Sequence, residues 1–278
     1  MKSQYGFILM TISEFESWIV QQKVTRRITV IQEHHTWSPC YKQFNGSNHL
    51  QLQKNMRDYH VNRAGYADIA QNFTVFPDGM ICTGRSMNVA PAGCRGANTN
   101  GICIENLGNF DVGDDKMNAA QKDVIVRMAA ALLKKFKLSP ETGITYHAWW
   151  TDSGSPLGTY IAGRSCKTCP GTAFFGGNTR ASYDKNLKPL IVKAMNGTYN
   201  VPVKEEEEVT QEQFNKMMDN YLAGLAKQQP QAWSKEARDW AEGSGLIKGD
   251  EHGNKQYESY CSREQMVQFL YRFKDIVK

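Results

Sequence analysis

The chain has 278 residues, of which 41% are hydrophobic and 22% charged, and its formal net charge is +5. Residues 1–200 hold 22 Lys and Arg against 14 Asp and Glu, a net +8, whereas residues 201–278 hold 11 against 14, a net −3. This composition is typical of a globular protein with one large core and a smaller module, and no apolar run approaches the roughly 18 to 20 residues that cross a bilayer.

The first 197 residues alternate between helical and strand patterns. The hydrophobic spacing predicts helices at 13–23, 49–61 and 118–138, the last capped by Asn118 with Gln121 three residues on. It predicts strands at 27–35, 101–108 and 143–147, and a hairpin of strands at 71–76 and 80–84 that turns at Pro77-Asp78-Gly79. This order indicates an α/β domain with a mixed sheet and flanking helices.

An acidic linker is predicted at 198–209, between a domain at 1–197 and a helical module at 210–278. It contains turn residues, a proline and four glutamates at 205–208 that repel one another. Alternatively, the glutamates form the first turn of the next helix, where the helix dipole favours acids, and Thr210 and Gln213 have the spacing of a capping box. We predict helices at about 211–227, 234–242 and 263–275.

The N-terminus and the cysteines bear on the cellular compartment. The N-terminus has only a few consecutive apolar residues, and glutamates follow where a small-residue cleavage site would stand. We therefore expect no signal peptide and synthesis in the cytoplasm, so that a role outside the membrane needs another exit route. Seven scattered cysteines, an odd number, argue against a disulfide framework and favour reduced thiols or a metal site.

Three side chains of this sequence suit a zinc site. His34 and His35 are adjacent at the end of a predicted strand, His147 ends another, and Cys169 lies in a turn before Pro170-Gly171. Imidazole and thiolate are ligands of Zn²⁺, and three protein ligands with one open position define a catalytic zinc. Because the groups are far apart in sequence, their spacing alone is only moderately specific.

A family resemblance strengthens this interpretation. "HHTW" at 34–37, "YH" at 146–147 and "CKTCPG" at 166–171 resemble the motifs of the zinc amidase family, which includes phage N-acetylmuramoyl-L-alanine amidases and animal peptidoglycan-recognition proteins. The resemblance covers roughly residues 25–180, including the hairpin "ADIAQNFTVFPDGMICTGR". It implies the amidase fold, a central mixed β-sheet flanked by helices, and Zn²⁺ as cofactor.

Carried over by position, the family's zinc ligands fall on His34, His147 and Cys169. The first histidine of the "HHT" motif is the usual ligand, and strand alternation places His35 on the opposite face. His35 is then a core residue or a neighbour of the site.

The family's acidic residue, which exchanges a proton with the attacking water, matches Glu105, and its oxyanion-stabilising lysine matches Lys167. A carboxylate among apolar residues of a buried strand is costly without a reason, and a raised pKa would suit proton transfer. The alternatives are that Glu105 pairs with a buried Arg85 and that Lys167 is an ordinary surface lysine.

Two further residues are expected to contact the substrate, Gln71 and Trp37. Some phage relatives carry a tyrosine at the position of Gln71. Glutamine donates a hydrogen bond but exchanges no proton, so the acid–base role rests on Glu105.

The C-terminal stretch at 232–274 resembles a single S-layer-homology repeat, with "GLIKGD" between its helices and "SREQM" opening the second. The resemblance implies binding to a secondary polymer of Gram-positive cell walls. Such repeats usually act in threes, whereas this chain has one. A homo-oligomer through this module, or a helical packing module without wall binding, are the alternatives.

Together these features predict a zinc-dependent N-acetylmuramoyl-L-alanine amidase. We expect a phage or prophage endolysin that acts on peptidoglycan of a Gram-positive host after holin-type release, with an anionic wall and not nucleic acid as the polyanionic partner. The runner-up is a non-catalytic peptidoglycan-binding protein of the same fold. A thiol oxidoreductase using Cys166 and Cys169 is a weaker alternative without a thioredoxin-like context, and Cys166 has no assigned role.

Overall fold

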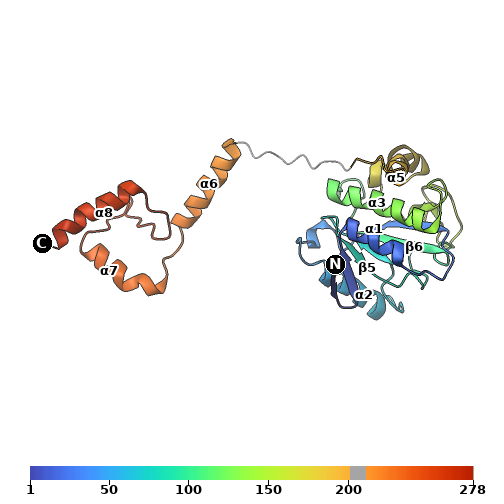
Figure 1. Ribbon diagram of the computed structural model, residues 1–278, viewed down its shortest axis with the longest axis horizontal. Helices are drawn as coiled ribbons and strands as arrows, with labels where there is room; N and C mark the ends of the chain where they lie inside the picture. The colour runs from blue at the N-terminus through green and yellow to red at the C-terminus, as the bar shows by residue number, and fades with distance from the viewer. Residues whose placement is uncertain (201–210, 278) are drawn as a thin grey trace. The chain divides into compact units, whose positions relative to one another are not determined.

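The computed structural model describes residues 1–200 and 211–277, and the chain divides into two compact units, Met1–Lys204 and Glu205–Lys278 (Figure 1). The glutamates at 205–208 and the predicted capping pair Thr210 and Gln213 lie outside the described residues and side chains.

The first unit is built on one seven-stranded mixed sheet, with strand order β1-β2-β5-β4-β6-β3-β7. Strands β3, β4, β6 and β7 pair in parallel, whereas β1, β2 and β5 join through antiparallel pairs. The strands are β1 Lys2–Gln4, β2 Phe7–Met10, β3 Val30–His35, β4 Phe73–Val75, β5 Ile81–Thr83, β6 Gly101–Asn106 and β7 Ile144–Tyr146. The predicted strands and the hairpin are confirmed, and β1 and β2 are additions at the N-terminus.

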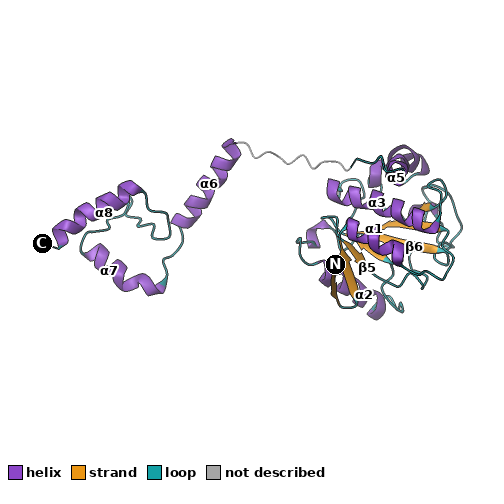
Figure 2. Cartoon of the chain, in the orientation of Figure 1, coloured by secondary structure: helices purple, strands orange, loops and turns teal. Residues whose placement is uncertain are grey.

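Five α-helices and several short helical turns surround this sheet (Figure 2). The helices are α1 Ile12–Gln21, α2 His49–Asn62, α3 Ala119–Phe136, α4 Arg180–Ser182 and α5 Lys188–Met195. The turns are η1 Tyr41–Gln43, η2 His147–Trp149, η3 Phe174–Gly176 and the π-type η4 Tyr183–Leu187. The side chain of Asn118 accepts a hydrogen bond from the Gln121 amide at the start of α3, as the sequence predicts.

The two faces of the sheet are covered differently. Helices α1 and α3 pack on one face and form the main core with α5, whereas α2 packs on the other face against β2 and β5. Core side chains such as Ile31, Ile102 and Ile104 point to the α3 side because strand side chains alternate between faces. The α2 side of β3 and β6 is therefore left for polar side chains.

A buried amide fixes β3 and β6 to each other next to this polar face. The Nδ2 group of Asn106 donates to Glu33 Oε2 and to the His34 carbonyl, both at 2.8 Å. Burial raises the pKa of Glu33 to about 8, and the bond from Asn106 opposes this shift. The register of the two strands is thus held by a hydrogen bond that also anchors the backbone of His34.

The second unit contains α6 Gln211–Ala226, η5 Ala232–Ser234, α7 Lys235–Gly243 and α8 Arg263–Ile276. The three helices predicted here are confirmed. Among its described residues only Ala241 is buried, while many large apolar side chains are exposed: Phe214, Met217, Met218, Tyr221, Trp233, Trp240, Tyr260, Met266, Val267, Leu270, Tyr271, Phe273 and Val277. No described helix of either unit is long and apolar enough to cross a membrane.

Candidate metal centre

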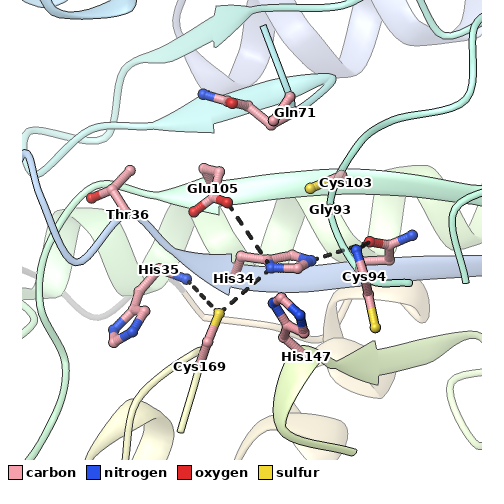
Figure 3. A network of polar contacts seen from close by, with 12 residues as sticks. His34, His35, Thr36, Gln71, Gly93, Cys94, Cys103, Glu105, His147 and Cys169 are labelled. Atoms are coloured by element: carbon pink, nitrogen blue, oxygen red, sulfur yellow. Dashed lines mark hydrogen bonds and ion pairs between the residues drawn. The ribbon is translucent and has the colours of Figure 1, made fainter. Parts of the chain in front are cut away.

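One face of the sheet gathers the polar side chains of β3 and β6. In the parallel register of these strands Gln32 lies opposite Cys103, and His34 lies opposite Glu105. Because each pair is two residues from the next, all four side chains point to the same face. Figure 3 shows His34 and Glu105 turned toward each other, with His147 and Cys169 entering from neighbouring segments.

The donor atoms of His34, His147 and Cys169 all lie within 4.8 Å of one another. The Sγ atom of Cys169 is 3.5 Å from Nδ1 of His34, and the rings of His34 and His147 are 4.9 Å apart. Zinc bonds of ordinary length in a tetrahedral site separate a sulfur and a nitrogen ligand by about 3.5 Å. The three residues predicted from sequence are thus brought together in an arrangement that fits Zn²⁺.

Hydrogen bonds on both sides of Cys169 hold the loop that carries it. Asp111 accepts hydrogen bonds from the Thr168 hydroxyl at 3.1 Å and the Thr172 amide at 2.9 Å. Gly171 has φ +117°, and a Cβ there would lie 2.4 Å from the carbonyl oxygen of Phe110, so only glycine fits. The amide of His35 also points to Cys169 Sγ at 3.4 Å. The thiol is therefore held in place by the fold around it.

A buried glutamine fixes the orientation of the His34 ring. The Oε1 atom of Gln32 lies 3.1 Å from His34 Nε2 and accepts a hydrogen bond from the Cys94 amide at 2.9 Å. A carbonyl oxygen accepts only, so Nε2 carries the proton and the lone pair of Nδ1 faces Cys169. Gly93 packs beside this contact, where a Cβ would lie 2.6 Å from Gln32 Oε1.

Electrostatics keep both histidine ligands neutral. Burial lowers the pKa of His34 well below its ordinary value, and His147 and Lys167 lower it further. Burial lowers the pKa of His147 to about 4, again with help from Lys167. Burial and the nearby Glu105 raise the pKa of the Cys169 thiol well above its ordinary value. Two imidazoles are thus ready to bind a metal, whereas the thiol must lose a proton to do so.

Glu105 lies at the edge of the metal centre. Its Oε1 is 4.0 Å from His34 Nδ1, and its buried Oε2 has no hydrogen-bond partner among the described residues. Burial raises the pKa of Glu105 to about 8, opposed by the charge of Lys167. The alternative pairing with Arg85 is wrong, because that guanidinium donates to the carbonyls of Ile69, Ala90 and Asp68.

The remaining predicted neighbours lie around this centre. His35 turns away from it (Figure 3), and its Nδ1 accepts a hydrogen bond from the Phe110 amide at 3.1 Å. Lys167 is exposed and lines the same cavity as the ligands. The Cys166 thiol contacts the His147 carbonyl at 3.4 Å, and burial raises its pKa. Raised pKa values at both thiols disfavour a redox pair of Cys166 and Cys169.

Several residues of the site are not singled out by any sequence motif. Gln32, Gly93 and Asp111 carry no motif, and their roles depend on strand register and loop packing. Cys103, on the strand predicted at 101–108, is fully buried, and its thiol also lies within 4.8 Å of donor atoms of His34 and Glu105. Strand alternation from His34 and Glu105 would have placed Gln32 and Cys103 on this face.

Two cavities lie beside the metal centre, and their volumes are about 620 Å³ and 610 Å³. Both include Trp37 and Glu105, and the second extends along α2 past Met56 and Tyr59 to Gln71. Trp37 is 64% exposed, so its indole face is free for contact. Gln71 is fully buried, and its Nε2 donates to the Thr74 hydroxyl at 2.9 Å. Both predicted substrate contacts therefore line a cavity beside Glu105.

Three ligands, an adjacent carboxylate and an open cavity define a zinc-hydrolase type of site on a mixed α/β sheet. The family model for N-acetylmuramoyl-L-alanine amidases matches residues 24–172, and the chain belongs to this family. The predicted fold class and the zinc-type site are thereby confirmed.

Individual relatives are similar over shorter stretches. Peptidoglycan-recognition protein SC2 of Drosophila simulans is 40% identical over 58 residues, which are 21% of this chain and 32% of that protein. The chain thus spans about a third of the length of this curated relative. Bumblebee PGRP-SA aligns with TM-score 0.45 and 19% identity over 59% of this chain and 84% of its own. The amidase LysC of Clostridium intestinale aligns with TM-score 0.40 and 20% identity over 54% and 80%.

Replacing Gln32 with leucine is expected to weaken zinc binding about 10- to 100-fold, because His34 Nε2 loses the acceptor that fixes its tautomer. Gln32→Glu keeps an acceptor and should retain more of the affinity. Competition with a chromophoric zinc chelator measures both, with circular dichroism as a check on folding. Equal zinc affinity in wild type and Gln32→Leu would show that Gln32 does not position the ligand.

Proposed function

We propose that the chain hydrolyses the amide between N-acetylmuramic acid and the L-alanine of the peptidoglycan stem peptide. The observation that carries this proposal is the placement of Glu105 beside the ligand set, with a carboxylate oxygen unpartnered among the described residues. Membership of the amidase family supports the choice of bond. A binding protein would gain nothing from a buried carboxylate without a partner.

The residues divide the chemistry among them. His34, His147 and Cys169 would hold zinc, which would supply a Lewis acid for activation of water and polarisation of the amide carbonyl. In its ionised form Glu105 accepts the proton of the attacking water, and it returns that proton to the alanine nitrogen as the C–N bond breaks; burial, which raises its pKa to about 8, favours the protonated form that makes this delivery. The Lys167 ammonium, at the mouth of the cavity, stabilises negative charge on the carbonyl oxygen.

The test uses soluble muropeptides and the zinc-loaded full chain. We expect new L-alanyl amino groups, detected by amine labelling and mass spectrometry, and none when a chelator is present. Muropeptide binding without such groups would overturn the proposal and favour the runner-up, a non-catalytic peptidoglycan-binding protein. The curated relatives are named peptidoglycan-recognition proteins, and recognition is the function of this alternative.

We further propose that the chain is a phage or prophage endolysin acting on a Gram-positive wall after holin-type release. The basic first unit and the resemblance of 232–274 to a wall-binding repeat support this role. A Gram-positive cell that expresses the protein in its cytoplasm should stay intact while its membrane is intact. The cell should lyse once the membrane is permeabilised. Lysis without permeabilisation would contradict the proposed route.

The C-terminal unit is proposed to associate with further copies of itself, as a wall-binding or oligomerisation module. Its exposed apolar side chains on α6 and α8, including Phe214, Tyr221, Met266 and Leu270, exceed what a lone small module leaves uncovered. Light scattering should give a mass above one chain for the full protein and one chain for a protein ending at residue 200. A monomeric full chain would contradict self-association.

A further inference from the structure

A further cavity of the first unit, which Phe110 also lines, is surrounded by lysines. It has a volume of about 770 Å³, and Lys116, Lys122, Lys185 and Lys193 line it. These come from the loop before α3, from α3, from η4 and from α5. The helices α3 and α5 lie side by side in the first unit (Figure 1). We call this cavity with its four lysines the lysine groove.

The four lysines have no carboxylate partner among the described residues. The acids next to Lys122 and Lys185 in sequence are already engaged: Asp123 lies 3.8 Å from Arg127, and Asp184 pairs with Arg180 and Lys188. The groove has one acidic lining residue, Asp115, whose Oδ2 accepts the backbone amides of Tyr41 and Asn109. Four positive charges therefore face one negative charge that is turned to the protein backbone.

Apolar side chains form the floor of the groove. Phe110, Met117 and Val126 are buried beneath it, and Phe175 and Leu190 are half-buried at its sides. An apolar floor lowers the dielectric around bound charges and strengthens their attraction to the lysines. Such a floor also suits the C–H surface of a sugar or polyol unit between two anionic groups.

The distribution of charge indicates the kind of ligand. Lysine acts as a flexible point charge for phosphate, and four lysines from separate segments suit a repeated anion better than one compact phosphate. Of the aromatic residues that line the groove, Phe110 is buried and Phe175 and Tyr199 are half-buried, so the groove offers bases little ring surface on which to stack. This favours a polymer of polyol or sugar phosphates over a nucleic acid.

We propose that the lysine groove binds the phosphodiester chain of an anionic cell-wall polymer. This site lies on the amidase unit itself and is independent of the C-terminal module. The segment after Cys169 contributes Ala173, Phe175 and Gly176 to the groove, and Phe110 separates it from His35. Polymer bound there would hold the unit on the wall without occupying the cavities beside Glu105.

The test measures binding of end-labelled poly(glycerol phosphate) to the zinc-loaded full chain by fluorescence anisotropy. Replacing the four groove lysines with glutamine should reduce affinity about tenfold or more, because four charge pairs with phosphate are lost together. The matched control replaces the exposed Lys2, Lys23, Lys134 and Lys137, which carry the same charge and lie outside the groove. We expect the control to bind within about twofold of wild type, and wild-type binding to weaken with salt.

Several results would overturn the proposal. Equal losses in the groove and control variants would show only non-specific attraction to net charge, and no loss in either would exclude the groove. Tighter binding of single-stranded DNA of equal charge would assign it to nucleic acid. Binding that appears only after Glu205–Glu208 are replaced with glutamine would assign the groove to the chain's own acidic segment. Because no turnover is measured, failure of the proposed amidase activity would leave this result interpretable.

Discussion

Cys169→Ser is expected to abolish both zinc binding and amide hydrolysis, with turnover at least about 10³-fold lower, whereas Cys166→Ser should leave both nearly intact. The two cysteines are three residues apart, yet only the thiol of Cys169 lies among the donor atoms of His34 and His147. Cys166 contacts the His147 carbonyl instead. A serine hydroxyl keeps its proton at neutral pH and does not replace a thiolate ligand.

The protonation of Cys169 provides a second readout that does not depend on turnover. Because burial and Glu105 raise the pKa of this thiol, it carries a proton at neutral pH that zinc must displace. The histidine ligands release none, since the pKa of His147 is lowered to about 4 and that of His34 is also lowered by burial. Zinc affinity of the wild type should therefore rise about tenfold per pH unit between pH 6 and 8.

Calorimetry in buffers of different ionisation enthalpy measures this proton release directly. Wild type and Cys166→Ser should release one proton more for each zinc bound than Cys169→Ser releases with whatever zinc it still binds. Elemental analysis of the purified proteins gives their zinc content. Full zinc content in Cys169→Ser would show that another set, such as His34, Cys103 and Glu105, holds the metal.

The elements that form the site were predictable because their patterns are local. The β-branched run before His34 defines β3, and the spacing of apolar residues from Val124 to Phe136 defines α3. The strands at the N-terminus were not predicted, because the turn at Tyr5 and Gly6 carries no proline or asparagine signal, and residues 2–4 are fully exposed. Helix α5 was not predicted either. It follows a π-type turn and has a proline in its first turn, and a proline in a sequence pattern usually indicates the end of a helix.

The ligand set was predictable only through family resemblance, since 113 positions separate His34 from His147. What positions the ligands was not predictable in this way. Gln32 acts on His34 because both point to the same face of β3, and Asp111 reaches Thr168 and Thr172 across a loop. These contacts are long-range in sequence or use common residue types, so no local pattern distinguishes them from surface polar groups.

Glu105→Gln is expected to reduce turnover about 10²- to 10⁴-fold while zinc binding stays within a few-fold of wild type. Glutamine keeps the shape of the side chain and its carbonyl acceptor but neither accepts nor returns a proton. Glu105→Asp keeps a carboxyl group but places it at a greater distance from the metal centre. Its turnover should lie between that of wild type and that of Glu105→Gln. Retention of full turnover by Glu105→Gln would mean that proton transfer does not pass through this residue.

Glu105→Gln should also change how the stability of the metal-free protein depends on pH. This pH dependence tests whether the pKa of Glu105 is raised. Burial raises the pKa of Glu105 from 4.5 to about 8, so the folded chain keeps a proton that the unfolded chain loses above about pH 4.5. Stability from this group is therefore present at low pH and is lost as the pH rises from about 4.5 to 8, by up to about 1.4 kcal/mol per pH unit.

Urea unfolding in the presence of a chelator measures this effect. The free energy of unfolding of Glu105→Gln should increase relative to that of wild type as the pH rises across this window. A constant difference between the two proteins from pH 5 to 8 would show that the pKa of Glu105 is not raised in the metal-free folded chain.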